Sequence, residues 1–144
     1  MKRNFLFLSV LILSSFIQST YTASTETLIA SLNGVGLTSS QIAYFTKLII
    51  NETCTTHIDV LNAMIALGQP SYSAYLACQT NCNTLYPIDT LQCTNYAQGT
   101  HPLCTSNANC MAKSCEKYTS GFNQIFVSAL TYSQQNNLPF PYDF

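Results

Sequence analysis

Charge is scarce in this sequence of 144 residues. Asp, Glu, Lys and Arg together make up only 8% of it, and tryptophan is absent. Beyond Arg3 the chain holds three lysines against six acidic residues, which gives a net charge of −3 with both histidines neutral. Proteins that bind nucleic acid or anionic membranes need clusters of Lys and Arg to neutralise phosphates. The composition therefore argues against nucleic acid as a partner.

Long apolar stretches are also missing, because no segment reaches the roughly 18 residues that a transmembrane helix needs. The longest run covers residues 5–17, follows two basic residues and leads into small and hydroxyl residues. That order is typical of a cleavable secretion signal. We therefore predict a signal peptide over 1–22, a mature chain that begins near Ala23, and a secreted, extracellular protein.

The common catalytic and metal-binding motifs are absent as well. The sequence has no G-x-S-x-G motif, no phosphate-binding loop, no carboxylate pair and no C-x₂-C spacing of the kind found in zinc sites. Cys54 and His57 come nearest to a catalytic pair, but no further group nearby would depress the pKa of the thiol. We expect a protein that is not an enzyme, with no catalytic residue, no metal and no cofactor.

Seven cysteines are what the mature chain does have. In an oxidising compartment they are expected to pair. Residues that face each other in an antiparallel helix pair have residue numbers with a nearly constant sum, and this favours a nested set of bridges. The predicted pairs are Cys78–Cys115, Cys82–Cys110 and Cys93–Cys104, with Cys54 as the odd cysteine.

A rival pairing stays open, because a tight turn at 68–71 would also bring Cys54 opposite Cys82. The nested set has its own difficulty. Cys110 and Cys115 are five residues apart, roughly 140° around an ideal helix, so Cys110 is expected at a frayed first turn. If Cys54 is odd, we expect it to be exposed in a polar break and to form a disulfide-linked homodimer.

Caps and breakers divide the mature chain into short helices. The helices are predicted at 24–34, 38–50, 56–68, 71–85 and 109–132, with a break at 51–56. Pro87, Gly99 and Pro102 interrupt the next stretch, which we predict as a long loop over 87–107 that contains cysteine. The fold class is all-α: a small disulfide-stapled bundle of about five helices, forming one domain over 23–137. An extended tail of prolines and aromatic residues follows at 138–144, and we expect it to dock on its own bundle.

Asn51-Glu52-Thr53 fits the sequence for N-glycosylation and falls within the predicted break, so Asn51 is the candidate glycan site. The nine tyrosines are too many for all to be buried, and tyrosine provides contact area at low entropic cost. We therefore expect an extracellular protein-interaction or signalling module with a protein partner that the sequence does not identify.

The first three cysteines, spaced C-x₂₃-C-x₃-C from Cys54, resemble the opening of the insect odorant-binding proteins over about thirty residues. The four later cysteines crowd into 93–115 and depart from that pattern, so no family is assigned. The resemblance implies a pocket for an apolar ligand. The alternative function is therefore an extracellular carrier of a small apolar ligand or lipid.

Overall fold

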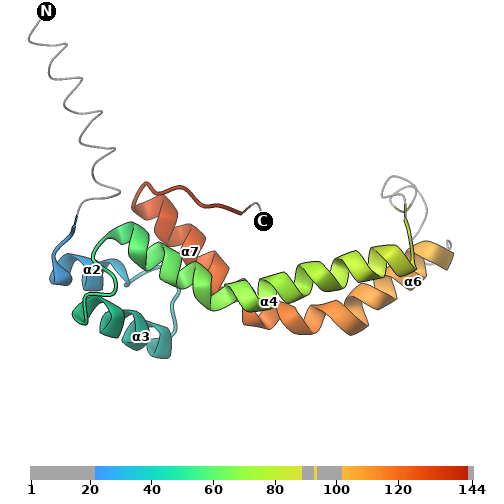
Figure 1. The fold of residues 1–144 in the computed structure, drawn as a ribbon, viewed down its shortest axis with the longest axis horizontal. Helices are drawn as coiled ribbons and strands as arrows, with labels where there is room; N and C mark the ends of the chain where they lie inside the picture. The colour runs from blue at the N-terminus through green and yellow to red at the C-terminus, as the bar shows by residue number, and fades with distance from the viewer. Residues whose placement is uncertain (1–21, 89–92, 94–101, 143–144) are drawn as a thin grey trace, which may run out of the picture. The chain divides into compact units, whose positions relative to one another are not determined.

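The computed structural model describes residues 22–88, 93 and 102–142, and throughout these residues the regular structure is helical, with no strand (Figure 1). The predicted all-α class is thereby confirmed. The helices are α2 (Thr25–Ser31), α3 (Ser39–Ile50), α4 (His57–Leu85), α6 (Pro102–Cys110) and α7 (Asn123–Gln135), with a π-helical segment η1 (Met111–Cys115) and a 3₁₀ segment η2 (Glu116–Gly121). Within the described part of the chain, no helix combines the length and the apolar character needed to cross a bilayer.

The chain forms two compact units. Unit 1 contains the described residues up to Ala66 together with those from Gln124 onward, and unit 2 spans Leu67–Asn123. Helix α4 runs through both units. The single domain expected over 23–137 stays a prediction.

Two capping boxes begin α3 and α4 in unit 1, as the sequence predicts. Thr38 Oγ1 accepts from the backbone N–H of Gln41 at 3.2 Å, and Gln41 Oε1 accepts from the N–H of Thr38 at 2.9 Å. Thr56 and Asp59 make the same reciprocal pair, each bond being 3.1 Å. These bonds satisfy N–H groups that the first turn of a helix leaves without partners, and so they fix where each helix starts.

Apolar side chains from α2, α3, α4 and α7, and from the segment that joins α2 to α3, fill the core of unit 1. They are Leu28, Leu32, Val35, Phe45, Ile49, Val60, Leu61, Met64, Ile125, Phe126, Ala129 and Tyr132. The hydroxyl of Tyr132 lies 2.9 Å from Ser31 Oγ, which itself donates to the carbonyl of Leu28 at 2.6 Å. Because the Ser31 proton is thus engaged, Tyr132 is the donor in the first bond. This chain of bonds joins α7 to α2 through the core.

The end of α7 directs the tail back onto unit 1. Asn137 adopts a left-handed conformation with φ of 54°, and the N–H of Leu138 donates to the carbonyl of Ser133 at 2.8 Å. This is the Schellman arrangement that commonly closes helices. The rings of Phe140 and Tyr142 then lie 6.3 Å and 5.3 Å from that of Phe126. The described tail residues, 138–142, therefore dock on the unit that contains α7, as expected.

The predicted turn at 68–71 is wrong, because α4 continues through Gly68 and Pro70 as one helix of 29 residues. A proline inside a helix removes one hydrogen bond and costs about 3 kcal/mol. Contacts within unit 2 offset that cost. The rings of Tyr72 and Tyr75 pack at 5.1 Å and 5.4 Å from Phe122, and two disulfides hold the later turns of α4.

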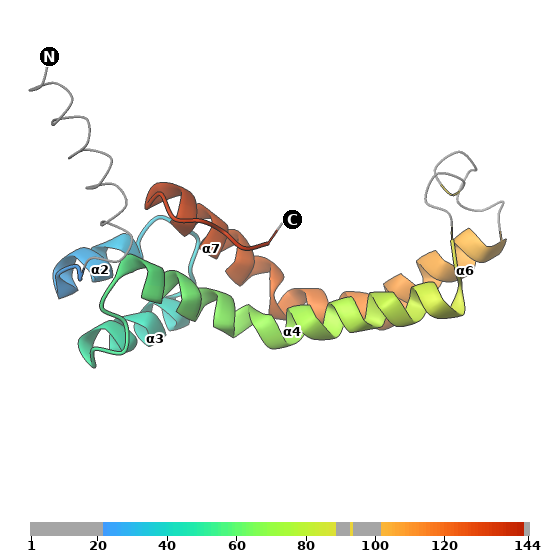
Figure 2. The ribbon, with the colours of Figure 1, turned by 45° about the horizontal axis from the view of Figure 1, so that its top comes forward.

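The predicted loop over 87–107 is wrong for its last six residues, since α6 begins at Pro102. Proline is well suited to the first helical position, where its missing N–H has no partner to lose. Residues 89–92 and 94–101 of that loop lie outside the described residues. From α6 onward, η1 and η2 continue beside the second half of α4, as both ribbon views show (Figure 2).

Gly121 allows η2 to approach α4 closely. A Cβ added at Gly121 would lie 2.6 Å from Ser71 Cβ and closer still to Ser71 Oγ. Real Cβ atoms do not come so near, so this crossing requires glycine. Although glycine weakens a helix, Gly121 is therefore a packing requirement of unit 2.

Candidate functional site

Three disulfides in unit 2 define the candidate site. The structure joins Cys78 to Cys115, Cys82 to Cys110 and Cys93 to Cys104, with Cα–Cα distances of 5.5, 5.8 and 5.7 Å. These are the pairs of the nested set. The rival Cys54–Cys82 bridge is not formed, because it needed the turn at 68–71 that the continuous helix α4 replaces.

A π-helical segment resolves the spacing of Cys110 and Cys115. A π-turn forms bonds from residue i to i+5, so residues five apart return to nearly the same face. Segment η1 covers Met111–Cys115, and this brings both cysteines toward α4. The expectation that Cys110 lies at a frayed first turn is wrong, since it is the last residue of α6, about two turns after that helix begins at Pro102.

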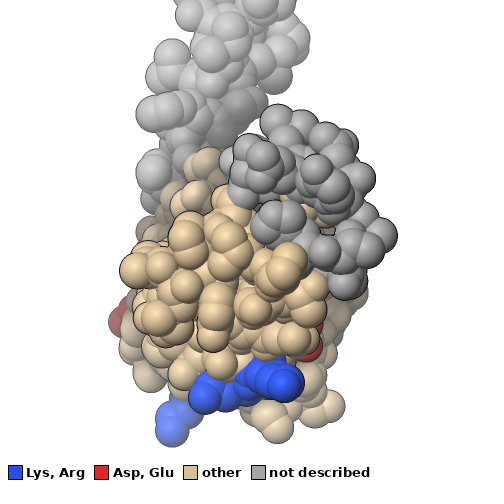
Figure 3. All heavy atoms as spheres, turned by 90° about the vertical axis from the view of Figure 1, so that its right-hand side faces the viewer, with Lys and Arg blue, Asp and Glu red and all other residues tan. Residues whose placement is uncertain are grey.

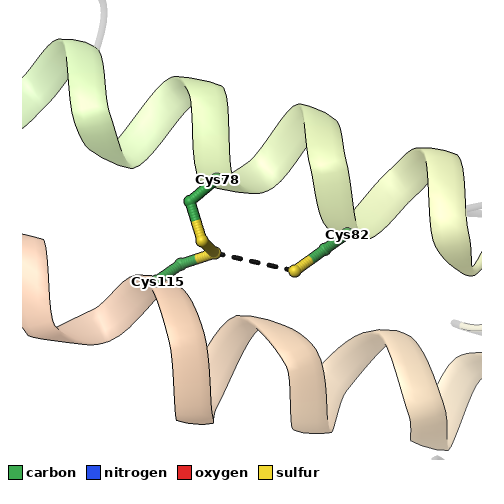
Figure 4. A group of neighbouring side chains, drawn as sticks. All are labelled: Cys78, Cys82 and Cys115. Carbon is green, nitrogen blue, oxygen red and sulfur yellow. Dashed lines mark hydrogen bonds between the residues drawn. A yellow bond between two sulfur atoms is a disulfide. The ribbon is translucent and has the colours of Figure 1, made fainter.

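The two bridges between α4 and its neighbour touch each other. Cys82 Sγ lies 3.6 Å from Cys115 Sγ, the contact drawn as a dashed line in Figure 4. Both sulfurs are already in disulfides and carry no hydrogen, so this is a van der Waals contact. The sulfurs of Cys78, Cys82 and Cys115 all lie within 4.8 Å of one another. Since all three are oxidised in the structure, they form a disulfide cluster here and not a set of thiolate ligands.

A half-open cleft of about 410 Å³ adjoins this cluster. Cys110 lines it, together with mainly polar side chains and one cation. The polar lining residues are Asn81, Ser106, Asn109, Lys113 and Ser114. In this cleft the partly exposed Cys110, one residue of the Cys82–Cys110 bridge, and the ammonium group of Lys113 line the same space.

Asn107 closes the end of α4 near this cleft, a role that no pattern in the sequence indicated. Its side-chain nitrogen lies 2.9 Å from the carbonyl of Tyr86, 3.0 Å from Asn83 Oδ1 and 3.5 Å from the carbonyl of Cys82. Asn107 is buried, and its side-chain N–H groups donate to carbonyl oxygens at the C-terminal end of α4, where helix carbonyls lack backbone partners. Asn107 stood in the predicted loop, where no periodic pattern marked it.

Cys54 is the free cysteine, as the nested set requires, but it is buried in unit 1 with 3% of its surface exposed. The expected exposure is therefore wrong: the break between α3 and α4 folds back, and the N–H of Cys54 donates to the carbonyl of Leu48 at 3.0 Å. Burial, followed by the nearby Asp59 carboxylate, raises the pKa of the thiol. The predicted homodimer through Cys54 required an exposed thiol, and in this structure the thiol is buried.

His57 and Asp59 lie beside Cys54 without activating it. Burial lowers the pKa of His57, and its ring centroid lies 6.2 Å from that of Tyr132. Burial alone would raise the pKa of Asp59, but hydrogen bonds from Thr55 and Thr56 outweigh it and lower the pKa. The carboxylate thus serves the cap of α4, and its charge disfavours a thiolate at Cys54.

Asn51 is exposed at the end of α3. Its Oδ1 accepts from the N–H of Thr53 at 3.0 Å, and Glu52 adopts a left-handed conformation with φ of 65°. The three residues of the glycosylation sequence therefore form a tight exposed turn outside any helix.

The surface around the site is poor in charge. Figure 3 shows one face with few charged atoms: Lys or Arg atoms gather at its lower edge, and Asp or Glu atoms are visible at its two sides. Fold and site together define a class: an all-α, disulfide-stapled, cysteine-rich helical protein. Comparisons with known protein families, with curated proteins and with solved structures find no match to this chain.

Proposed function

We propose that this chain is a secreted protein-interaction or signalling module that binds an extracellular protein through unit 2. The observation that carries the proposal is a helix pair fixed by two disulfides that still exposes large apolar side chains. Leu76, Leu85 and Leu103 keep 43%, 59% and 43% of their surface in contact with solvent. Exposed apolar side chains offer contact area to a partner, and a contiguous group of them is typical of a protein interaction site.

The disulfides add to this argument. Bridges Cys78–Cys115 and Cys82–Cys110 hold the two sides of the pair in one arrangement before any partner arrives. A surface that is already ordered loses less entropy on binding. Such rigidity suits recognition of another folded protein.

The carrier alternative has weaker support. A carrier needs an enclosed, mainly apolar cavity of several hundred Å³. The cleft beside Cys110 is large enough but half-open, and most of its lining side chains are polar. An enzymatic role based on Cys54 is disfavoured too, because a buried thiol with a raised pKa is a poor nucleophile.

Saturable binding of the labelled protein to cells of its source organism, competed by unlabelled protein, tests the proposal. The double variant Leu76→Ser/Leu85→Ser should lose most of this binding at an unchanged melting temperature. Ala77→Ser alters an exposed but small side chain of the same helix and is the matched control. Equal binding by both variants, or no saturable binding at all, would refute the proposal. Stoichiometric, saturable uptake of a fluorescent apolar probe would favour the carrier.

Secretion itself has a separate test. N-terminal sequencing of material from the culture medium should begin near Ala23, whose backbone N–H already donates to the carbonyl of Thr55 at 3.0 Å. Treatment with an N-glycosidase should reduce the mass of wild type and leave Asn51→Gln unchanged. Material that retains Met1 would contradict the signal peptide, and an unchanged wild-type mass would contradict the glycan.

A further inference from the structure

The disulfide cluster of unit 2 has an accessible side and a buried side. Cys82 and Cys115 are fully buried, whereas Cys78 and Cys110 are partly exposed. Each bridge therefore joins one outer sulfur to one inner sulfur, and the two inner sulfurs touch at 3.6 Å. Breaking either bridge from outside leaves an inner thiolate in contact with the other bridge.

Of the two partly exposed cysteines, Cys110 lines the cleft described above, and Cys78 does not. Cys110 shares this cleft of about 410 Å³ with Lys113, Asn81 and Asn109, and no acidic residue lines it. An ammonium group and amide donors favour an anionic ligand, because they offer positive charge and N–H groups without a competing carboxylate. The cleft can therefore bring a small anion to the Cys110 bridge.

We propose that Cys110 is a thiol-reactive site at which a small anionic thiol, a carboxylate-bearing peptide thiol of the glutathione type, forms a mixed disulfide and starts an exchange through the cluster. In the first step the incoming thiolate bonds to Cys110 Sγ. The Cys82–Cys110 bond breaks, and Cys82 leaves as a thiolate. The attack requires only the thiolate of the ligand as co-reactant.

In the second step the Cys82 thiolate bonds to Cys115 Sγ. The Cys78–Cys115 bond breaks, and Cys78 leaves as a thiolate that takes up a proton from water. Rotation about χ1 of Cys82, free once its bond to Cys110 is broken, brings its sulfur into line for attack. One thiolate enters and one leaves, so the number of disulfide bonds is conserved and no net oxidant is consumed.

Solvation gives the exchange its direction. A thiolate at Cys82 is fully buried, whereas one at Cys78 is partly exposed to water. Burial penalises the charged form of a thiol, so the charge moves toward the better solvated position. The expected product carries the ligand on Cys110, a new Cys82–Cys115 bridge and a free thiol at Cys78.

Limited incubation of the full secreted protein with reduced glutathione, followed by acid quenching, alkylation and non-reducing peptide mapping, tests the proposal. The first modified species should carry glutathione on Cys110, the alkyl label on Cys78 and a Cys82–Cys115 linked peptide. A first species with Cys82–Cys110 intact would overturn the proposed entry point. Glutathione on Cys110 with the label on Cys82 would overturn the second step.

Charge and background controls complete the experiment. Lys113→Gln should slow the reaction with glutathione about three- to tenfold while leaving that with neutral 2-mercaptoethanol unchanged. Lys117→Gln is the matched control, since Lys117 contacts the ring of Tyr118 and does not line the cleft. Equal rates of reaction with glutathione for wild type and Lys113→Gln would refute the proposal that the cleft attracts the negative charge of the ligand. The Cys54→Ser variant should give the same products, and products that require Cys54 would refute exchange within the cluster.

Discussion

The crossing of Gly121 and Ser71 gives the sharpest test of the packing in unit 2. In Gly121→Ala the new methyl group would lie 2.6 Å from Ser71 Cβ, an atom fixed to the backbone of α4 that no side-chain rotation can move. Either η2 or α4 must therefore shift. Overpacking of this kind costs about 1–3 kcal/mol, whereas alanine in place of glycine within a helix gains about 1 kcal/mol. Because Ser71 Cβ cannot rotate away, we place the overpacking cost at about 2–3 kcal/mol, which leaves a net loss of about 1–2 kcal/mol.

That loss corresponds to a melting temperature lower by roughly 4–8 °C for a domain of this size. Thermal unfolding of the oxidised protein, followed by circular dichroism, measures it. Ser120→Ala, an exposed neighbour in the same segment, should leave the melting temperature within about 2 °C. The swap Ser71→Gly/Gly121→Ala moves the side chain from one helix to the other. It should show a favourable coupling energy of at least 1 kcal/mol in a double-mutant cycle. A more stable Gly121→Ala, or purely additive effects, would refute the close crossing.

Three further predictions concern unit 1. Burial raises the pKa of Tyr132 to about 12, against about 10 in an unfolded chain. Between these two pH values only the unfolded state loses the phenol proton. The free energy of unfolding therefore falls as pH rises through that window. Denaturant unfolding at pH 9 and 11 should show a smaller fall in Tyr132→Phe than in wild type; equal falls would contradict the assignment. Hydrogen bonds lower the pKa of Asp59 in the folded protein. Its contribution to the free energy of unfolding is therefore fully present above the pKa of the unfolded chain, and it disappears as pH falls through the pKa of the folded protein. Asp59→Asn should therefore cost about 1 kcal/mol at pH 7 and almost nothing near pH 2, and a pH-independent difference would count against this. Deletion of 138–144 removes buried Leu138 and two rings from Phe126, and should lower the free energy of unfolding by roughly 2–4 kcal/mol; an unchanged value would mean that the tail does not support the fold.

Local signals in the sequence were sufficient for the starts of α3 and α4. A capping box depends on two side chains three residues apart, so Thr38 with Gln41 and Thr56 with Asp59 could be recognised without knowing the rest of the fold. The bridges of the nested set could also be worked out, because they follow from counting residues along two antiparallel helices.

Features that depend on distant contacts could not be predicted. Pro70 reads as a helix breaker, and its cost in α4 is offset by distant contacts, the packing of Tyr72 and Tyr75 on Phe122 and the two disulfides. The burial of Cys54 likewise depends on how the break folds against unit 1. Pro102 was different, since its suitability as a first helical residue was a signal in the sequence that the loop prediction overlooked.

Segment η1 also allows two helical segments with different cysteine spacings to face each other. On α4 the cysteines repeat every four residues, and on the facing chain they repeat every five, so one side must wind more loosely for both bridges to close. Each residue of a helix turns the chain by about 100°. A deletion of one residue within 111–114 would restore regular α-helix and still align the two cysteines. Every residue after Cys115 would keep its spacing from that cysteine, so Gly121 would still meet Ser71. The π-helical turn therefore absorbs the extra residue locally and leaves the register of the following segment against α4 unchanged.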